Sequence, residues 1–116
     1  MTLGALTNPN NNEIGMDITN NSGSIIQITR FYAIWTKSPI SQKIDKLFLN
    51  GAEIWNKSDP DSPSDFPTEG NWVGGAGPAI PDATLENFVI QFSNDLLQPT
   101  EVHIVFDIGC QIVGTK

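Results

Sequence analysis

Hydrophobic and polar residues alternate with a period of two along much of the chain, which is the spacing of a β-strand with one buried face. The clearest example runs from Glu13 to Asn20, where Ile14, Met16 and Ile18 fall on one face. No segment shows the period of an amphipathic helix, so the sequence predicts an all-β fold. The same alternation predicts strands at Ala83–Ser93 and Glu101–Asp107. A short last strand is predicted at Cys110–Val113.

The middle of the chain adds a long strand and a hairpin. Ser24–Thr36 is rich in β-branched and aromatic residues, which is typical of a central strand buried on both sides for part of its length. Its alternation fails near Arg30–Phe31, where we expect a bulge. Asn50 and Gly51 tolerate positive φ, so they predict a two-residue hairpin turn. The turn would join strands Lys46–Leu49 and Ala52–Trp55.

Between Asn56 and Asp82 the composition changes to Pro, Gly, Ser and Asp, which predicts one long loop. About seven short strands at spacings of roughly ten residues are typical of a two-sheet β-sandwich of immunoglobulin-like type. An open Greek-key barrel is the alternative architecture.

Length and charge limit the kinds of function. A chain of 116 residues has room for one hydrophobic core. We expect residues 1–12 to form an extended arm with an Asn-rich spacer, and residues 13–116 to form the sandwich. The formal net charge of −7 opposes binding to nucleic acid, and apolar runs such as Phe88–Ile90 are too short to insert into a membrane.

Candidate catalytic and metal-binding residues are few. The one histidine, His103, is expected to face away from the apolar stripe of its strand, and a nucleophilic pair with the one cysteine, Cys110, depends on the strand register. The acidic residues of the long loop form a weak candidate for a calcium site, which competes with a plain acidic turn. These residues are Asp59, Asp61 and Asp65. We therefore expect no cofactor and no enzyme activity.

Three tryptophans in so short a chain raise sugar binding as an alternative function. Trp55 and Trp72 flank the long loop, where exposed rings would stack on a glycan, although strand position makes Trp55 a candidate for the core as well. Asn20–Ser22 and Asn56–Ser58 match the N-glycosylation pattern, which favours an extracellular setting slightly.

The N-terminus suggests a way to assemble. Leu3, Ala5 and Leu6 lie in a weakly alternating stretch, and the spacer Asn8–Asn12 separates them from the first clear strand. Such an arm can add to the sheet of a neighbouring copy through main-chain hydrogen bonds, and an open head-to-tail contact of this kind produces a filament. The alternative is a frayed terminus.

Several segments together resemble an uncharacterised family of immunoglobulin-like domains of bacterial secreted and cell-surface proteins. They are Leu47–Gly51 through Trp55, Ile80–Ala83 before a strand ending at Phe92, and Val105–Cys110. The resemblance implies an extracellular or cell-surface location, and it implies a second cysteine to pair with Cys110, which this chain lacks. From the residues and the resemblance we expect a structural subunit that self-associates into a filament, with carbohydrate binding as the alternative.

Overall fold

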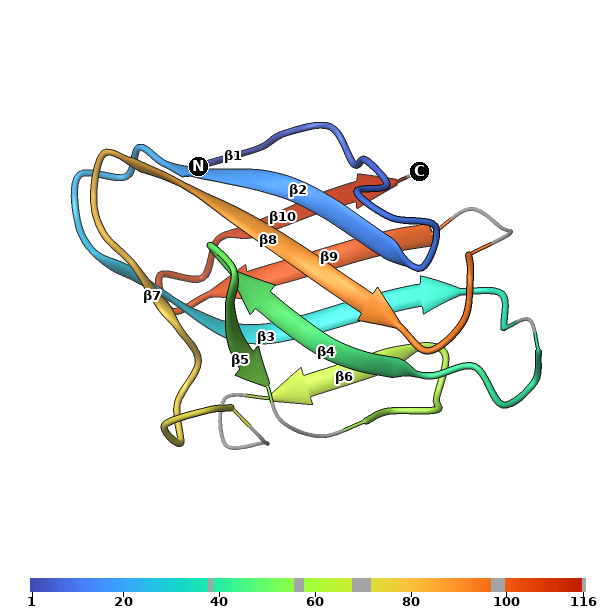
Figure 1. Ribbon diagram of the computed structural model, residues 1–116. Helices are drawn as coiled ribbons and strands as arrows, with labels where there is room; N and C mark the ends of the chain where they lie inside the picture. Colours follow the sequence, from blue (N-terminus) through green and yellow to red (C-terminus); the bar gives the residue numbers. More distant parts are fainter. Residues whose placement is uncertain (38, 56–57, 68–71, 97–99, 116) are drawn as a thin grey trace.

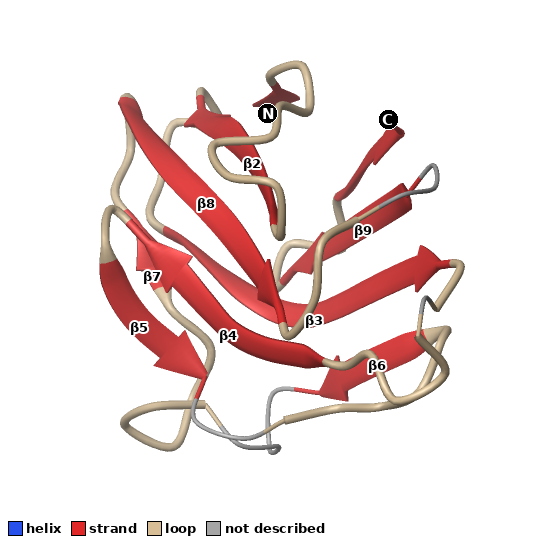
Figure 2. Cartoon of the chain, turned by 45° about the vertical axis from the view of Figure 1, so that its right-hand side comes forward, coloured by secondary structure: helices blue, strands red, loops and turns tan. Residues whose placement is uncertain are grey.

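Two antiparallel β-sheets packed face to face form the fold (Figures 1 and 2). The computed structural model describes residues 1–37, 39–55, 58–67, 72–96 and 100–115, except for the side chains of residues 66 and 67. Within these ranges there is no helix of the length and hydropathy needed to cross a membrane. The predicted all-β, two-sheet sandwich is confirmed.

The central strands are β8 (Thr84–Phe92) in the first sheet, and β3 (Ile26–Trp35) and β9 (Thr100–Phe106) in the second. The first sheet runs in the order β1 (Thr2–Leu3), β2 (Glu13–Asn20), β8 (Thr84–Phe92), β4 (Ile44–Leu49), β5 (Ala52–Trp55). The second runs in the order β10 (Gln111–Thr115), β9 (Thr100–Phe106), β3 (Ile26–Trp35), β6 (Ser64–Pro67), and β7 (Ala79–Ile80) also pairs with β3.

The alternating residues meet between the sheets, as the pattern predicted. Phe31 of the second sheet stacks on Phe88 of the first with ring centroids 5.6 Å apart, and Trp35 meets Phe92 edge to face at 5.2 Å. Burial of these rings and of the aliphatic residues beside them supplies the main driving force for packing. The other buried hydrophobic residues of β2, β3, β8 and β9 are Ile14, Met16, Ile18, Ile26, Ile28, Ala33, Ile90, Val102, Ile104 and Phe106.

Strand β3 has the expected bulge but a different burial pattern. Its pairing with β9 shifts register between Ile28 and Arg30, so the irregularity lies next to the predicted position. After the shift, Phe31 points into the core and Arg30 points outward. The expectation that part of β3 is buried on both sides was wrong, because its outer face carries half-buried and exposed side chains.

The hairpin between β4 and β5 is confirmed. Asn50 and Gly51 have φ values of 50° and 80°, the positive values that this two-residue turn requires. The Asn50 side chain accepts a hydrogen bond from the backbone N–H of Asn87 at 2.8 Å, and the Asn50 N–H donates to the carbonyl of Asn87 at 2.7 Å. These bonds fix the turn to the neighbouring strand β8.

The segment predicted as one long loop contains two short strands. Strand β6 pairs with Arg30–Ala33, and β7 pairs with Ile26 and Gln27, so both lie along β3. Neither strand has a hydrophobic pattern long enough to be recognised beside the prolines and aspartates of this segment. Their pairing depends on the backbone of β3, which only the tertiary structure supplies.

The first of the two N-glycosylation matches is buried. Asn20 has no exposed surface, and its amide donates to the carbonyls of Ser24, Ile80 and Pro81 at 2.8, 3.0 and 3.1 Å. The Asn20 match therefore gives no support for an extracellular setting, because this side chain joins two loops inside the protein. The second match begins at residues 56–57, outside the described residues.

Candidate interaction surface

The outer face of the second sheet carries aromatic, charged, amide and aliphatic side chains. Strand register places these residues in cross-strand rows on one face. One row contains Asp65, Tyr32, His103 and Val113; the next contains Arg30, Val105 and Gln111; the third contains Ile34, Glu101 and Thr115. We call this set the β3–β9 face.

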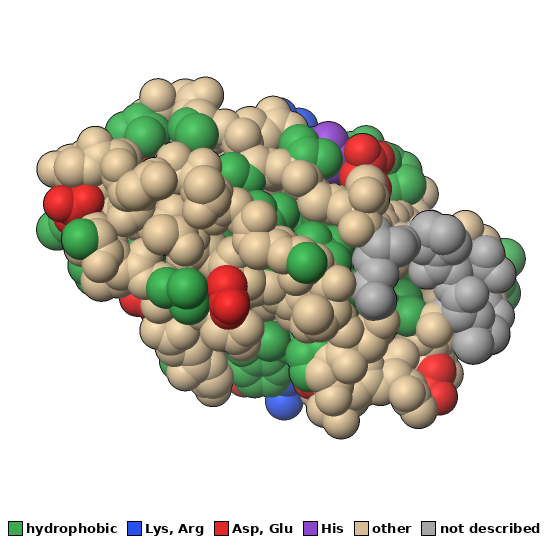
Figure 3. Space-filling model, turned by 90° about the horizontal axis from the view of Figure 1, so that it is seen from above, with side chains coloured by type: hydrophobic (Ala, Val, Ile, Leu, Met, Phe, Trp, Pro, Cys, Tyr) green, Lys and Arg blue, Asp and Glu red, His purple; other side chains and the backbone are tan. Residues whose placement is uncertain are grey.

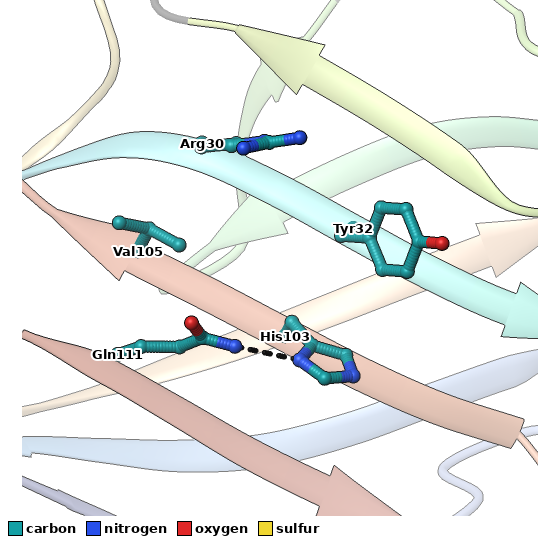
Figure 4. A pocket seen from close by; sticks show the side chains of 5 residues that line it. All are labelled: Arg30, Tyr32, His103, Val105 and Gln111. Atoms are coloured by element: carbon teal, nitrogen blue, oxygen red, sulfur yellow. Dashed lines mark hydrogen bonds between the residues drawn. The ribbon is translucent and has the colours of Figure 1, made fainter.

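A surface pocket of about 290 Å³ lies in the middle of the β3–β9 face (Figure 4). Its walls are side chains from two neighbouring cross-strand rows on strands β3, β9 and β10. An aromatic ring, an aliphatic side chain and several hydrogen-bonding groups therefore converge on one small volume, as in many binding sites. The lining residues are Arg30, Tyr32, His103, Val105 and Gln111.

His103 is held from three sides. Gln111 Nε2 lies 2.7 Å from His103 Nδ1, and Glu101 Oε1 lies 3.3 Å from His103 Nε2. Donation by the Gln111 amide fits the neutral ring with its hydrogen on Nε2, facing Glu101. The Tyr32 ring meets the imidazole edge to face at a centroid distance of 5.5 Å. These contacts orient the ring as part of a rigid surface.

The register does not bring Cys110 to His103. His103 pairs with Val113, whereas the carbonyl of Cys110 accepts a hydrogen bond from the N–H of Phe106 at 2.9 Å. Phe106 stands three positions along β9 from His103, which corresponds to about 10 Å at the rise of a strand. A thiol–imidazole pair needs direct contact, so this arrangement does not support the nucleophilic pair.

Arg30 and Asp65 form a two-point ion pair at one border of the β3–β9 face. Arg30 Nε donates to Asp65 Oδ1 at 2.8 Å and Nη2 donates to Oδ2 at 2.6 Å. The hydrogen bond and the charge of Asp65 raise the pKa of Arg30. Both side chains are exposed, at 54% and 43%, so the pair orients the edge strand β6 more than it stabilises the fold.

The three acidic residues proposed for calcium are not gathered into a site. The Asp59 carboxylate accepts a hydrogen bond from the N–H of Asp61 at 2.8 Å, which closes a local turn, while Asp65 pairs with Arg30. Among the described residues, no group of three or more His, Cys, Asp or Glu side chains is arranged to hold a metal ion. The acidic turn is the better description of this segment.

Trp55 and Trp72 lie in the core. They are 2% and 3% exposed, and their backbones form an antiparallel bridge at the edge of the first sheet. A ring must present one face to solvent to stack on a sugar, so neither tryptophan serves as the exposed glycan contact that the sequence raised. Burial also explains why the chain keeps both rings next to a polar loop.

The arm residues Leu3 and Leu6 pack on their own chain. Strand β1 pairs with β2, and Thr7 and Gly15 exchange two backbone hydrogen bonds of 2.8 Å. Leu6 is only 9% exposed, whereas Ala5 is exposed. A Cβ at Gly114 of β10 would come within 2.3 Å of Leu6 and 2.8 Å of Leu3. The arm thus joins the edges of both sheets, and only a glycine leaves it room.

Sequence reasoning placed His103 on the outer face but did not identify the pocket. The sequence feature that pointed to this face is that Tyr32 and His103 alternate with the buried residues of their strands, and so lie on the outer side of the sheet. Two further facts were needed, namely the register of β3 with β9 and the bulge that turns Arg30 outward.

Comparison with protein-family models and with curated proteins finds no match to the sequence. Among solved structures, the fold is similar to the archaellum periplasmic stator protein FlaG from Sulfolobus acidocaldarius. The TM-score is 0.51 with 14% sequence identity, and the likeness covers 99% of this chain and 98% of the FlaG chain. The two proteins share a fold. At 14% identity the similarity shows the fold alone. It covers nearly the whole chain, so it includes the N-terminal arm.

Proposed function

We propose that this chain is a non-catalytic structural subunit of a cell-surface or cell-envelope assembly, and that copies join by exchanging their N-terminal arms. The observation that supports this function best is the buried site of Leu6, which lies between the two sheets and contacts Gly114. The rest of the domain forms the site that Leu6 fills. The same residue of a neighbouring copy can therefore fill this site instead.

The contacts of the arm favour exchange over simple fraying. Gly4 donates to the carbonyl of Asp17 at 2.7 Å, and Thr7 pairs with Gly15, so the arm adds main-chain hydrogen bonds to the edge of β2. These bonds and the burial of Leu6 are the same whether the arm comes from its own chain or from a neighbour. The balance between the two arrangements therefore depends on protein concentration and on the connecting segment.

The connecting segment is short and polar; residues 8–11 are exposed, and Asn12 is fixed to Phe92 of β8 by hydrogen bonds of 2.8 and 3.0 Å. Asn8 donates to the carbonyl of Glu13 at 2.9 Å and Asn10 donates to the Glu13 carboxylate at 2.6 Å, both at the surface. Water can replace exposed hydrogen bonds of this kind at little cost in free energy. Opening of this turn would free the arm to move and would leave the buried site of Leu6 empty until the arm of a neighbouring copy fills it, which makes residues 8–11 the hinge of the exchange.

Two further observations support a structural role at the cell surface. One solved structure with a similar fold is an archaellum periplasmic stator protein. The outer face of the second sheet carries a pocket whose groups are held by one another, which suits recognition of a partner more than chemistry. A domain of this kind acts through protein–protein contacts.

A disulfide trap tests arm exchange directly. In a Cys110→Ser background, Leu6→Cys and Gly114→Cys together place two thiols at the contact between arm and β10, because Leu6 Cγ lies 3.5 Å from the Cβ position of residue 114. The Leu6→Cys change removes the Cδ1 that would meet this Cβ at 2.3 Å, and the end of the Leu3 side chain, at 2.8 Å, has to shift. After mild oxidation at high protein concentration, a non-reducing gel shows which copy supplies the arm. The single variants Leu6→Cys and Gly114→Cys are the matched controls, since each can form nothing larger than a dimer.

We expect a ladder of covalent multimers from the double variant. Covalent dimers alone would contradict the filament, because they indicate a closed reciprocal exchange. Internally linked monomers alone, at every concentration, would contradict exchange altogether.

A further inference from the structure

Within the described residues, β10 is the sheet edge that is neither short nor protected by a charge or a proline, and the arm reaches it through the side chains of Leu3 and Leu6 at Gly114 without pairing with it as a strand. Native edge strands avoid unwanted pairing by being short or by carrying charges or prolines. Of the four edges, β1 has two residues, β5 contains Glu53, and β6 contains Asp65 and Pro67. Strand β10, with five residues, has neither a charge nor a proline.

The outward backbone groups of β10 can be assigned from its pairing with β9. Phe106 donates to the carbonyl of Cys110, so the alternation of an antiparallel ladder directs the backbone groups of Ile112 and Gly114 toward β9 as well. The N–H and C=O groups of the residues between them then point away from the sheet. These residues are Gln111, Val113 and Thr115, and β10 pairs with no strand other than β9 in the described part of the chain.

The side chains of this edge favour contact with an uncharged, self-complementary surface. Val113 is 50% exposed and lies beside His103 on the β3–β9 face. Residues 108–115 contain no charged side chain, although the chain as a whole carries a net charge of −7. Viewed from the side where both chain ends lie, the molecule shows hydrophobic side chains among neutral polar groups, with charges only at scattered points (Figure 3).

We propose that a second copy of this chain pairs with β10 in antiparallel fashion, about a two-fold axis between the two Val113 residues. In this register Val113 lies opposite Val113 of the other copy, and Gln111 lies opposite Thr115. The outward groups of these residues form about six intermolecular hydrogen bonds, and the two second sheets become one continuous sheet.

Electrostatics and symmetry identify the occupant as a second copy. Two copies of an acidic protein repel one another over most of their surfaces, and an uncharged edge is where they approach at the lowest cost. A two-fold axis through Val113 pairs each residue with an uncharged partner, as an isologous contact requires. The pairing also brings the two His103 pockets onto the same side of one extended sheet. This pairing leaves the Leu3 and Leu6 side chains packed at Gly114, so it does not require arm exchange.

The orientation of the Val113 N–H provides a sharp test. Val113→Pro removes an N–H that points away from β9, so the variant loses no bond within its own sheet but can no longer pair across the axis. Val113→Thr is the matched control, because it keeps the N–H and the β-branched shape. The measurement is sedimentation equilibrium of the full chain over a wide concentration range, with circular dichroism and thermal unfolding to compare the folds.

At concentrations below those at which arm exchange links copies into larger multimers, we expect a native dimer of twice the 12.6 kDa chain mass, which Val113→Thr retains. For Val113→Pro we expect the dissociation constant to rise about tenfold or more. A native protein that stays monomeric throughout, or a Val113→Pro dimer as tight as the native one, overturns the proposal.

A second variant covers the outcome in which proline disturbs folding. Val113→Lys keeps the backbone donor and places two like charges at the axis, so it should weaken the dimer while the monomer fold persists. Val113→Cys in a Cys110→Ser background should give a covalent dimer on oxidation, since directly opposed residues have Cα atoms about 5.5 Å apart. Failure of both predictions would exclude the pairing, whereas arm exchange is reported separately by the Leu6–Gly114 trap.

Discussion

Tyr32 and His103 lie directly opposite each other on β3 and β9, and their rings meet edge to face at an interplanar angle of 85°. Opposed aromatic pairs on one face of a sheet stabilise the pairing of their strands. This contact also forms one wall of the pocket, so it links the stability of the second sheet to the shape of the candidate interaction surface.

A double-mutant cycle should detect the coupling between these two rings. We expect Tyr32→Ala to lower the free energy of unfolding by about 1–2 kcal/mol, and the Tyr32→Ala and His103→Ala changes to be non-additive by about 0.5–1.5 kcal/mol. Urea denaturation of the four proteins in the cycle measures both quantities. Tyr32→Phe keeps the ring and should remain close to the native stability; additive single effects would show that the rings do not interact.

The Arg30–Asp65 pair should act locally. Because both side chains are exposed, Arg30→Gln is expected to leave the unfolding midpoint nearly unchanged while amide hydrogen exchange in β6 becomes faster. Asp65 raises the pKa of Arg30, so on the alkaline side the contribution of the guanidinium is lost as the pH rises through that raised value. Arg30→Lys keeps the charge but loses the two-point geometry, and should fall in between. Unchanged exchange in β6 would argue against this role.

The buried tryptophans lead to a prediction opposite to that of a sugar-binding module. Trp72→Ala should destabilise the protein by about 3–5 kcal/mol, because it empties a large buried site next to Trp55. Trp72→Phe should lose less than half as much. Thermal or urea unfolding followed by circular dichroism gives the comparison. A Trp72→Ala protein of native stability with altered glycan binding would show that the ring is exposed in solution.

The sequence was sufficient for the parts of the fold that depend on local patterns. Alternation located β2 with both of its ends, and the Asn50–Gly51 turn followed from the φ values that these two residues tolerate. The outward direction of His103 followed from the same period of two. Each of these features is encoded within a few consecutive residues.

The sequence was insufficient where a residue's role depends on a distant strand. Strands β6 and β7 exist because β3 offers them a backbone to pair with, and nothing in their own polar residues indicates this. The burial of Trp72 depends on a bridge to Trp55, and the seat of Leu6 depends on the absence of a side chain at Gly114. Tyr32, His103 and Gln111 come together only through the register of three strands.

Asn20 allows a sharp test of one such long-range role. Its amide donates to carbonyls of the Ser22–Ser24 turn and of the Ile80–Pro81 segment, while its side-chain oxygen accepts hydrogen bonds from Ser22 at 2.7 and 3.0 Å. With Asn20→Ala, buried carbonyls lose their donor, and the free energy of unfolding should fall by about 2–3 kcal/mol. Asn20→Asp should be worse, because it places a negative charge beside these carbonyl oxygens in a site without solvent exposure.

The neighbouring residue is the matched control for Asn20. Asn21 is exposed and belongs to the same turn, so Asn21→Ala should leave the stability within about 0.5 kcal/mol of the native protein. Urea denaturation compares the three variants, and mass spectrometry of protein secreted from a glycosylating host should find Asn20 unmodified. Equal stability of Asn20→Ala and Asn21→Ala, or a glycan attached to Asn20, would mean that this side chain does not join the two loops, because a residue that holds buried carbonyls cannot also carry a sugar at the surface.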